Sequence, residues 1–533
     1  MDSKQIGIRV VLAFVTLLGI GCDRPQKGAS LPRHQIMKIN LFPPPESLDP
    51  RIGGETRSLP VTRMLFEGLL RLDLHDEPAL ALARSFEVSP CGRVYTFHLR
   101  PTTWSNGDPV TAYDFEYAWK WVIGPDSPSN FGLYFYPLLN AKKAKEGRVS
   151  MDEVGVRAVD EMTLVVTLNH PAPYFPQLVA SPPYAPVSKR WEEEHPRWAS
   201  SSEHFLSNGP FLLRESEPGS RFVFEKNPRY WDADQVELEV IEASLIDDGY
   251  TAYLMYEQGE LDFIGDPLCA LPLECALKLE EEGTLITQPI DGIFRVDFNT
   301  EHFPLDNQKI RQALSFAIDR EELVANVLKG GGEVATSPLP PNLTLSSSPL
   351  IGADAKACAV ALFEEGLEEC GLTRETFPRL AFIYWAMGGH KATAQAIQQQ
   401  WKRTLGIKVD IQGCEFGVRR QRILAGDFDC TTTTWFSFYH DPVYSLNLYR
   451  KGDYMLNYTR WEDSRFRELL EASDQSPIGR EAYLQAAEIL IAEGSPSAPI
   501  YAPSFRYATH AEGVYLSPVG HIDLKWARLP RGR

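Results

Sequence analysis

The sequence lacks the long runs of one residue type that mark several classes of protein. It has no Lys/Arg-rich run and carries a formal net charge of −18, which disfavours broad attraction to nucleic acid or to anionic lipid. Beyond its N-terminus, no segment is apolar over the roughly 20 residues that a transmembrane helix needs. No internal repeat and no long low-complexity segment occurs, so a repeat architecture is not expected.

Familiar catalytic and metal-binding signatures are absent as well. The sequence contains no GxSxG, HExxH or P-loop motif and no dinucleotide fingerprint in a βαβ context, which disfavours the enzyme classes that these motifs mark. The run Glu192 to His195 places carboxylates beside an imidazole, but a solvated face is the expected interpretation there. A hydrolase with two carboxylates distant along the chain stays open as an alternative. We expect no enzymatic activity, no cofactor and no metal site.

Cysteine is scarce, with eight residues in the whole chain. Without Cys22 an odd number remains, so at least one thiol of an exported protein is unpaired within the chain. None of them forms a CxxC motif, and no His lies at zinc-ligand spacing. Cys269 with Cys275 and Cys358 with Cys370 are candidate disulfides, and buried free thiols are the alternative.

What is present is the composition of a large globular protein. A chain of 533 residues exceeds what one hydrophobic core supports, so two or three lobes are expected. Hydrophobic residues make up 44% and charged residues 23% of the chain, which are ordinary globular values. Helix-like and strand-like segments alternate along the sequence, which predicts an α/β fold.

The N-terminus has the order of features found in an export signal. Lys4 and Arg9 form a basic start, and the apolar stretch Val10 to Leu18 is too short to cross a bilayer. The stretch leads to Gly21-Cys22 ahead of a polar run. This arrangement resembles the cleavage box of bacterial lipoproteins, although position 19 holds Gly where those proteins usually carry Leu.

We therefore predict a lipoprotein signal peptide over residues 1–22 and a polar tether over residues 23–33. Acyl chains on Cys22 would anchor the mature protein, at about 0.8 kcal/mol per buried CH₂. A plain secretory signal that contains a cysteine is the alternative. The expected location is the periplasm or the outer face of the cytoplasmic membrane, with the chain lipid-anchored.

The segment Tyr95 to Phe115 predicts a strand, a tight turn and the start of a helix. Three apolar residues from Tyr95 to Leu99 alternate with polar ones, as in a half-buried strand. Asn106 to Pro109 is a turn cluster, since Gly accepts positive φ and Pro restricts φ. Thr111 suits an N-cap, with Asp114 in the first helical turn.

As a string, this segment closely resembles the signature of the oligopeptide-binding, family 5, extracytoplasmic solute-binding proteins. Other segments resemble further elements of the same family, and they follow in the same order from about residue 36 to residue 505. They are Phe66–Leu69, Ser207–Phe211, Lys226–Asp232, Asp297–Thr300, Pro304–Asp306, Arg311–Arg320, Gly426–Asp429 and Trp435–Pro442. Each element alone is weak, but their collinear order identifies the chain as a member of the family.

The resemblance implies an α/β, two-lobed class II periplasmic-binding-protein fold with an extra subdomain. Ligand would be trapped between the lobes by hinge closure. The implied parts are lobe I over residues 34–60, 190–290 and 505–533, a subdomain elaborating it over 61–189, and lobe II over 291–504.

The resemblance also implies a function, namely an extracytoplasmic solute-binding lipoprotein of an ABC importer that binds oligopeptides. Its partners would be the peptide, the permease subunits of the transporter and, through the lipid anchor, the membrane, and the protein is expected to be a monomer without nucleic-acid contacts. Family relatives also bind muropeptides, glutathione-like dipeptides, metal chelates and sugars, so a non-standard ligand is an alternative. A surface lipoprotein without a transport role is another.

One family element departs from its usual pattern at the site of interest. Where relatives read W-x-x-D-Y-x-x-P, with the Asp taking the peptide α-ammonium, this chain has Phe438 in the place of the Asp. An aromatic face attracts a cation but does not replace a carboxylate. By resemblance Asp441 and Asp297 are the nearest substitute acids, and repacked core is the alternative role of Phe438.

By the same resemblance, four aromatic and polar positions belong to the cleft. Trp435 has the best claim from its place in the motif, and Tyr439 is second. Phe416 falls where relatives often have a pocket aromatic, and Thr432 stands where some members carry a carboxylate-binding Arg.

The stretch Gly292 to Thr300 is predicted to be a strand with one apolar face and one polar face. The polar face offers Arg295, Asp297 and Asn299 in a row, on a strand that borders the cleft in the family. We hypothesise that Arg295 and Asp297 contact the termini of the ligand, since a guanidinium suits bidentate carboxylate recognition. A mutual surface pair without a ligand role, worth less than about 1 kcal/mol, is the alternative.

Overall fold

A computed structural model describes residues 35–52, 58–329, 331–352, 354–387, 389–452, 454–476 and 478–530. The predicted signal peptide, the tether and the acylation at Cys22 lie outside these residues. In the described part of the chain, no helix is both long and apolar enough to cross a membrane.

A four-stranded sheet joins the start of the described chain to its middle. Its strand order is β1-β10-β9-β8, with β1 parallel to β10 and the other neighbours antiparallel. The strands are β1 (Ile36–Asn40), β8 (Phe211–Glu217), β9 (Arg221–Lys226) and β10 (Val240–Ser244). Nearby helices are α1 (Ser58–Leu65), α6 (Gly249–Glu257) and α7 (Leu273–Glu281).

A second four-stranded sheet is formed within residues 83–167. Its order is β4-β5-β7-β6, all antiparallel. The elements of this region are β2 (Leu70–Leu72), β3 (Pro78–Leu80), β4 (Ala83–Val88), β5 (Val94–Leu99), α2 (Ala112–Ile123), α3 (Ala141–Lys145), β6 (Val156–Asp160), β7 (Thr163–Thr167), α4 (Phe175–Val179) and α5 (Lys189–Glu194).

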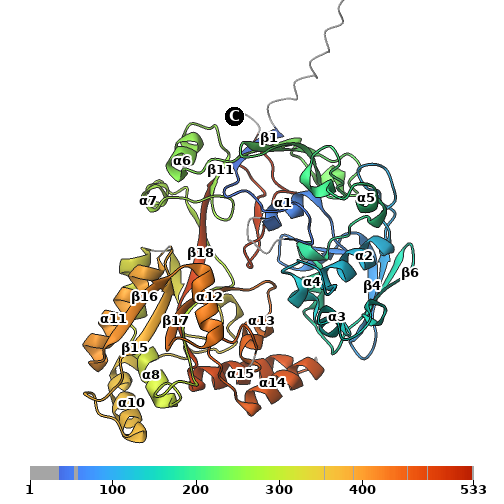
Figure 1. Cartoon of the computed structure of the whole chain (residues 1–533). Coiled ribbons are helices and arrows are strands. Elements are labelled where there is room, and N and C mark those ends of the chain that lie inside the picture. The colour runs from blue at the N-terminus through green and yellow to red at the C-terminus, as the bar shows by residue number, and fades with distance from the viewer. Residues whose placement is uncertain are drawn as a thin grey trace, which may run out of the picture. The chain divides into compact units, whose positions relative to one another are not determined.

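The largest sheet has the order β11-β18-β13-β17-β15-β16, and β12 and β14 also pair with β18. Its strands are β11 (Phe263–Gly265), β12 (Ile286–Pro289), β13 (Gly292–Phe298), β14 (Gly332–Val334), β15 (Leu380–Trp385), β16 (Val409–Cys414), β17 (Cys430–Phe436) and β18 (Ser497–Thr509). The long β18 (Figure 1) pairs with β13 and β14 along its first part and with β12 and β11 along its last. Strand β18 therefore ties residues 263–289 to the sheet of the C-terminal half.

Helices pack around this large sheet to form its core. Those of the C-terminal half are α8 (Gln308–Phe316), α9 (Arg320–Leu323), α10 (Ala355–Cys370), α11 (His390–Leu405), α12 (Phe416–Ala425), α13 (Pro442–Leu446), α14 (Ser464–Gln475) and α15 (Arg480–Gly494). One hydrophobic core combines β13 and β15 with α8, α10 and α11 around the buried Trp401. The short strands β19 (Tyr515–Leu516) and β20 (Ile522–Asp523) form a separate pair.

The predicted strand, turn and helix start within Tyr95 to Phe115 are confirmed. Tyr95 and the two apolar residues that alternate with it in β5 are buried, and Gly107 in the turn has a φ of 95°. Helix α2 begins after Thr111, whose backbone N–H donates to the Asp114 carboxylate at 2.8 Å. Burial raises the pKa of Asp114 to about 6 despite the bonds that it accepts.

One sequence expectation needs correction, and one question that the sequence left open is decided. The polar side chains of β13 do not lie at the surface: all seven residues of the strand are buried, and the Tyr449 ring lies over Arg295, with its centroid 5.4 Å from the guanidinium carbon. Strands β17 and β18 pair with its two edges. Cys269, Cys275, Cys358 and Cys370 are free thiols, as are the other described cysteines, so neither candidate disulfide forms.

Gly209 lies where a turn presses against the end of α1. Its N–H donates to the Leu65 carbonyl at 3.0 Å, and a Cβ at this position would lie 2.5 Å from the backbone nitrogen of Phe66. Since backbone cannot yield as a side chain does, we expect Gly209→Ala to lower the free energy of unfolding by about 1–3 kcal/mol. Urea unfolding followed by tryptophan fluorescence measures the loss. Gly389→Ala, where a Cβ meets nothing within 4 Å, is the control; equal losses in both variants would contradict the steric argument.

Candidate functional site

Two of the cavities lie where the end of β17 meets residues 131–178. After β17 the chain passes through a loop to α13, which begins at Pro442 with the Asp441 carboxylate accepting from the Val443 N–H at 2.9 Å. Pro at the first helical position and Asp at the N-cap explain why α13 starts here. This arrangement places Trp435, Tyr439 and Tyr444 along one wall.

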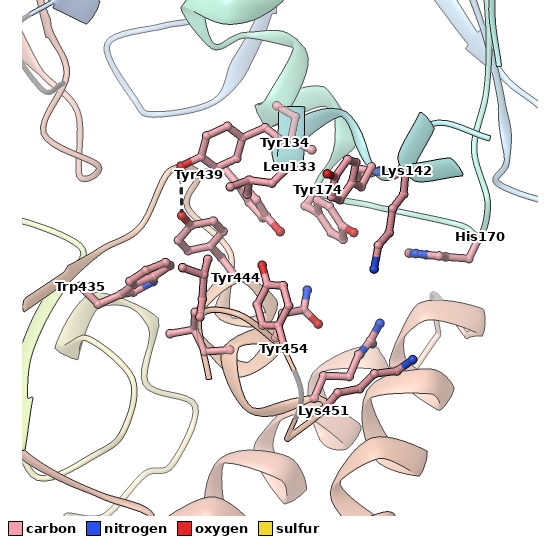
Figure 2. A pocket seen from close by; sticks show the side chains of 17 residues that line it. Leu133, Tyr134, Lys142, His170, Tyr174, Trp435, Tyr439, Tyr444, Lys451 and Tyr454 are labelled. Atoms are coloured by element: carbon pink, nitrogen blue, oxygen red, sulfur yellow. Dashed lines mark hydrogen bonds between the residues drawn. The ribbon is translucent and has the colours of Figure 1, made fainter. Parts of the chain in front are cut away.

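A first cavity of about 300 Å³ lies between this wall and the residues around α3 and α4 (Figure 2). It is lined by aromatic, basic and aliphatic side chains. They are Leu133, Tyr134, Tyr136, Pro137, Lys142, His170, Tyr174, Leu178, Trp435, Tyr439, Tyr444, Asn447, Leu448, Arg450, Lys451, Tyr454 and Leu456.

A second cavity of about 510 Å³ adjoins the first. It is lined by Leu59, Phe131, Tyr134, Asp266, Pro267, Thr434, Trp435, Phe436, Ser437, Phe438, Tyr444, Phe505, Val519 and His521. The two cavities share Tyr134, Trp435 and Tyr444. The hydroxyls of Tyr134 and Tyr444 are hydrogen-bonded at 3.5 Å (Figure 2), so this tyrosine pair forms the boundary between the cavities.

Aromatic stacking holds the two walls together. Phe438 stacks on Tyr134 with 3.7 Å between ring centroids, Tyr439 stacks on Tyr174 at 4.9 Å, and the shared Trp435 stacks on Tyr444 at 5.7 Å. Stacked pairs of this kind are worth about 0.5–1.5 kcal/mol beyond the area that they bury. The cavity walls are therefore built from both segments together.

The cavities bring together three of the residues singled out in the sequence. Trp435 lines both cavities, Tyr439 lines the first and Phe438 the second. Asp441 lines neither, and its carboxylate is held by Arg480 in two bonds of 2.9 and 2.7 Å. Phe416 lies at the start of α12 against Trp385, with centroids 5.9 Å apart, outside both cavities.

Arg295 and Asp297 bond to each other inside the sheet. Arg295 Nε donates to Asp297 at 2.7 Å, and both side chains are almost fully buried, at 2% and 0% exposure. One nitrogen of Arg295 and one oxygen of Asp297 have no hydrogen-bond partner among the described residues. Neither residue lines the two cavities, so their contact with a ligand stays a prediction.

The end of β17 has a partly open edge beside the cavities. Strand β13 pairs with the whole of β17, whereas β15 pairs only with Cys430 and Thr431. Beside the open part, Trp435 Nε1 and Ser437 Oγ are buried without a described hydrogen-bond partner. Buried polar groups normally have partners, so the wall carries two unsatisfied polar groups here.

Several lining residues were missed by reasoning from the sequence. Tyr134 and Tyr174 come from residues 61–189, Lys142 and Lys451 supply positive charge, and His170 supplies an imidazole. No motif or periodicity marks them, because only the packing of distant segments brings them to Trp435. The Glu192 run proved structural: Glu192 accepts two bonds from the buried Arg51, at 2.8 and 2.7 Å, and no group of potential metal ligands occurs among the described residues.

His440 links the cavity wall to the start of β13. Its Nδ1 lies 2.5 Å from the Asp291 carboxylate, and its backbone N–H donates to Gln177 at 3.0 Å. The hydrogen bond to Asp291 raises the pKa of His440 above 6.5, against the opposing effect of burial, and the charges of Asp76 and Asp441 add to the rise.

A raised pKa of His440 makes stability depend on pH in a defined direction. The stabilisation is fully present below pH 6.5 and is lost as the pH rises through the folded-state pKa. We expect the melting temperature of wild type to exceed that of His440→Gln most at pH 5.5 and least at pH 9. Thermal unfolding across this range tests it, with the exposed His75→Gln as control; a difference that grows with pH would be the wrong sign.

Comparisons with known proteins give the family. Residues 77–457 match the family described as bacterial extracellular solute-binding proteins, family 5 Middle. The chain belongs to this family. The oligopeptide-binding protein OppA of Bacillus subtilis is 36% identical to it over 474 residues, which is 87% of each chain.

Solved structures of relatives share the fold. The murein tripeptide binding protein MppA, in an unliganded open form, matches with a TM-score of 0.80 and 27% identity over 94% of this chain and 98% of its own. Haemophilus influenzae OppA in complex with the peptide RPPGFSPFR matches with a TM-score of 0.76 and 25% identity over 94% and 99% of the two chains. The predicted two-lobed α/β periplasmic-binding-protein fold is therefore confirmed.

Proposed function

We propose that this protein is the extracytoplasmic solute-binding subunit of an ABC importer, and that it binds oligopeptides without altering them. The observation that carries the proposal is the pair of aromatic-walled cavities that meet at Trp435. Cavities of this size, mostly apolar with a few polar groups, suit a small ligand. Relatives named for oligopeptides, and one solved with a peptide, support the ligand class.

The open edge of β17 supports a mode of binding. An extended peptide that adds to this edge would gain main-chain hydrogen bonds, while its side chains enter the cavities. Trp435, Phe438 and Tyr439 would form the walls, with Trp435 Nε1 and Ser437 Oγ offering bonds to the peptide. Closure of lobe II (291–504) on lobe I, with its subdomain, would then present the peptide to the permease subunits.

The presence of Phe438 in place of the family's Asp favours a second candidate ligand for the same binding function. Phe438 is stacked on Tyr134, and the two nearest substitute acids, Asp297 and Asp441, are each paired with an arginine. None of these residues offers a free carboxylate to an α-ammonium. A ligand without an ordinary α-ammonium would suit this wall. The candidates are a muropeptide, a glutathione-like dipeptide and a metal chelate, and a relative is named for a murein tripeptide.

Two measurements on the purified chain test the ligand. Native mass spectrometry is expected to detect peptides carried through purification, and their masses separate ordinary peptides from modified ones. A matching synthetic peptide at 100 times its Kd should stabilise the protein by about 2.7 kcal/mol in thermal unfolding. A chain that carries no peptide, and that no peptide stabilises, would refute the proposal.

We further propose that the mature protein is a monomer anchored through acyl chains on Cys22. Intact-mass analysis of membrane-extracted protein is expected to give a chain that begins at residue 22 and carries lipid. Cys22→Ser should abolish both the acylation and the membrane association. A mature chain that begins elsewhere, without lipid, would favour a plain secretory signal.

A further inference from the structure

The first cavity has positive charge at one end and no acidic side chain among the described residues that line it. Figure 2 shows Lys142 and His170 at the end away from Trp435, with Lys451 facing them. Within the described part of the chain, neither Lys142 nor Lys451 forms an ion pair, although the chain carries a net charge of −18. Their ammonium groups are therefore available to a ligand.

Unbonded N–H donors line the same cavity. Arg450 donates to Asp474 at 2.7 Å through one terminal nitrogen, but Arg450 Nε is buried without a described partner, as is Trp435 Nε1. Asn447 Oδ1, an acceptor, is unbonded as well. The cavity thus offers two unbonded N–H donors that an anionic group could use.

The tyrosines of the cavity add donors that stay protonated. Burial raises the pKa of Tyr454 to about 12, and burial also raises the pKa values of Tyr174 and Tyr439. Their hydroxyls are therefore neutral at physiological pH and able to donate.

We propose that the first cavity is a subsite for a carboxylate of the ligand, which Lys142 and Lys451 bind by charge-assisted hydrogen bonds. The inference rests on the proposed function and narrows it to peptides that bear an anionic group at this position. The carboxylate comes either from the C-terminus or from a Glu or Asp side chain, since the two share one chemistry.

The lining of the second cavity favours the same orientation of the ligand, with its carboxylate in the first cavity. Asp266 is the one acid among the described residues that line it, and no lysine or arginine is among them. The two cavities therefore differ in the charge of their lining. Among the described lining residues, the first has lysine and arginine side chains and no acid, whereas the second has Asp266 and no lysine or arginine, and the pair of Tyr134 and Tyr444 lies between them. A ligand with its negative group in the first cavity avoids Asp266.

Isothermal titration calorimetry on the full chain tests the subsite with defined tripeptides. Each tripeptide position holds either Glu or the isosteric Gln, and each peptide is made with a free and with an amidated C-terminus. Comparing Glu with Gln tests a side-chain carboxylate, and comparing the free with the amidated C-terminus tests the terminal carboxylate. For wild type we expect one carboxylate form to bind at least about tenfold more tightly than its amide counterpart. In the double variant Lys142→Met/Lys451→Met this ratio should fall below about threefold, with the Kd of the amide form changed less than about twofold.

Matched variants make the outcome decisive. Lys143→Met removes an exposed lysine beside Lys142 that does not line the cavity, and it should keep the wild-type ratio. Lys142→Glu/Lys451→Glu, with an unchanged melting temperature when unliganded, should prefer Lys over Gln in the peptide. Equal affinities of wild type for carboxylate and amide forms would overturn the subsite alone, whereas no binding of any peptide would overturn the proposed function.

Discussion

Asp523→Asn is expected to lower the free energy of unfolding by about 3–5 kcal/mol, because it leaves the buried Arg63 without its counter-charge and Arg71 with Glu67 alone. Asp523 is 1% exposed and accepts two bonds from Arg71, at 2.8 and 2.9 Å. Arg63 lies 3.4 Å from the same carboxylate. Urea unfolding at neutral pH measures the loss. Asp234→Asn, at an exposed position that forms no ion pair within the described part of the chain, should change stability by less than about 0.5 kcal/mol.

The same network predicts how stability responds to acid. Burial alone would raise the pKa of Asp523, but the charge and hydrogen bonds of Arg71, together with Arg63, lower it to about 2. A carboxyl with a depressed folded-state pKa stabilises the protein above its unfolded value of 3.8 and loses that contribution as the pH falls toward 2. Asp523→Asn should therefore unfold with a flatter pH dependence between about pH 4 and pH 2 than wild type. Equal slopes would show that Asp523 does not carry this coupling.

Trp435→Ala is expected to weaken peptide binding by about 2–4 kcal/mol, or roughly 30- to 1000-fold in Kd. Trp435 lines both cavities and stacks on Tyr444. Its removal would merge the cavities, remove an unbonded indole N–H and free Tyr444 from its stacking partner. Calorimetric titration with the peptide identified by native mass spectrometry gives the change.

Two variants separate binding from stability. Trp435→Phe keeps an aromatic ring and should recover most of the affinity, since only the indole N–H and part of the contact area are lost. Trp191→Ala removes an equally large side chain that packs on His195 and lines neither cavity. Trp191→Ala should lower the melting temperature without changing Kd by more than about twofold. A similar loss of affinity in both alanine variants would assign the effect of Trp435 to stability.

Local elements near the signature segment were predictable because their chemistry is local. The N-cap at Thr111 and the turn at Gly107 depend on side chains a few residues apart. The burial of β13 was not predictable in the same way. Alternation along Gly292 to Phe298 indicates two faces, but whether a face is covered depends on distant residues such as Tyr449, which lies over Arg295.

The candidate site likewise combines residues that the sequence revealed with residues that it did not. Trp435, Phe438 and Tyr439 were found from a motif, because they follow one another in the chain. Tyr134 and Lys142 were not found, because nothing in their own segment records that they face Trp435 across a cavity. Contacts between segments hundreds of positions apart leave no periodic signal in one sequence.

By itself, the sequence determined the family, the α/β class and the change of Asp to Phe438 in a ligand-binding element. These properties reside in the order of short segments, each with its own turn, cap or strand chemistry. The tertiary structure alone decided that Asp297 and Asp441 are each paired with an arginine, that a tyrosine pair divides the space beside Trp435, and that lysines lie on one side of it. Charge balance and cavity shape depend on which distant side chains meet, and only the packed chain specifies that.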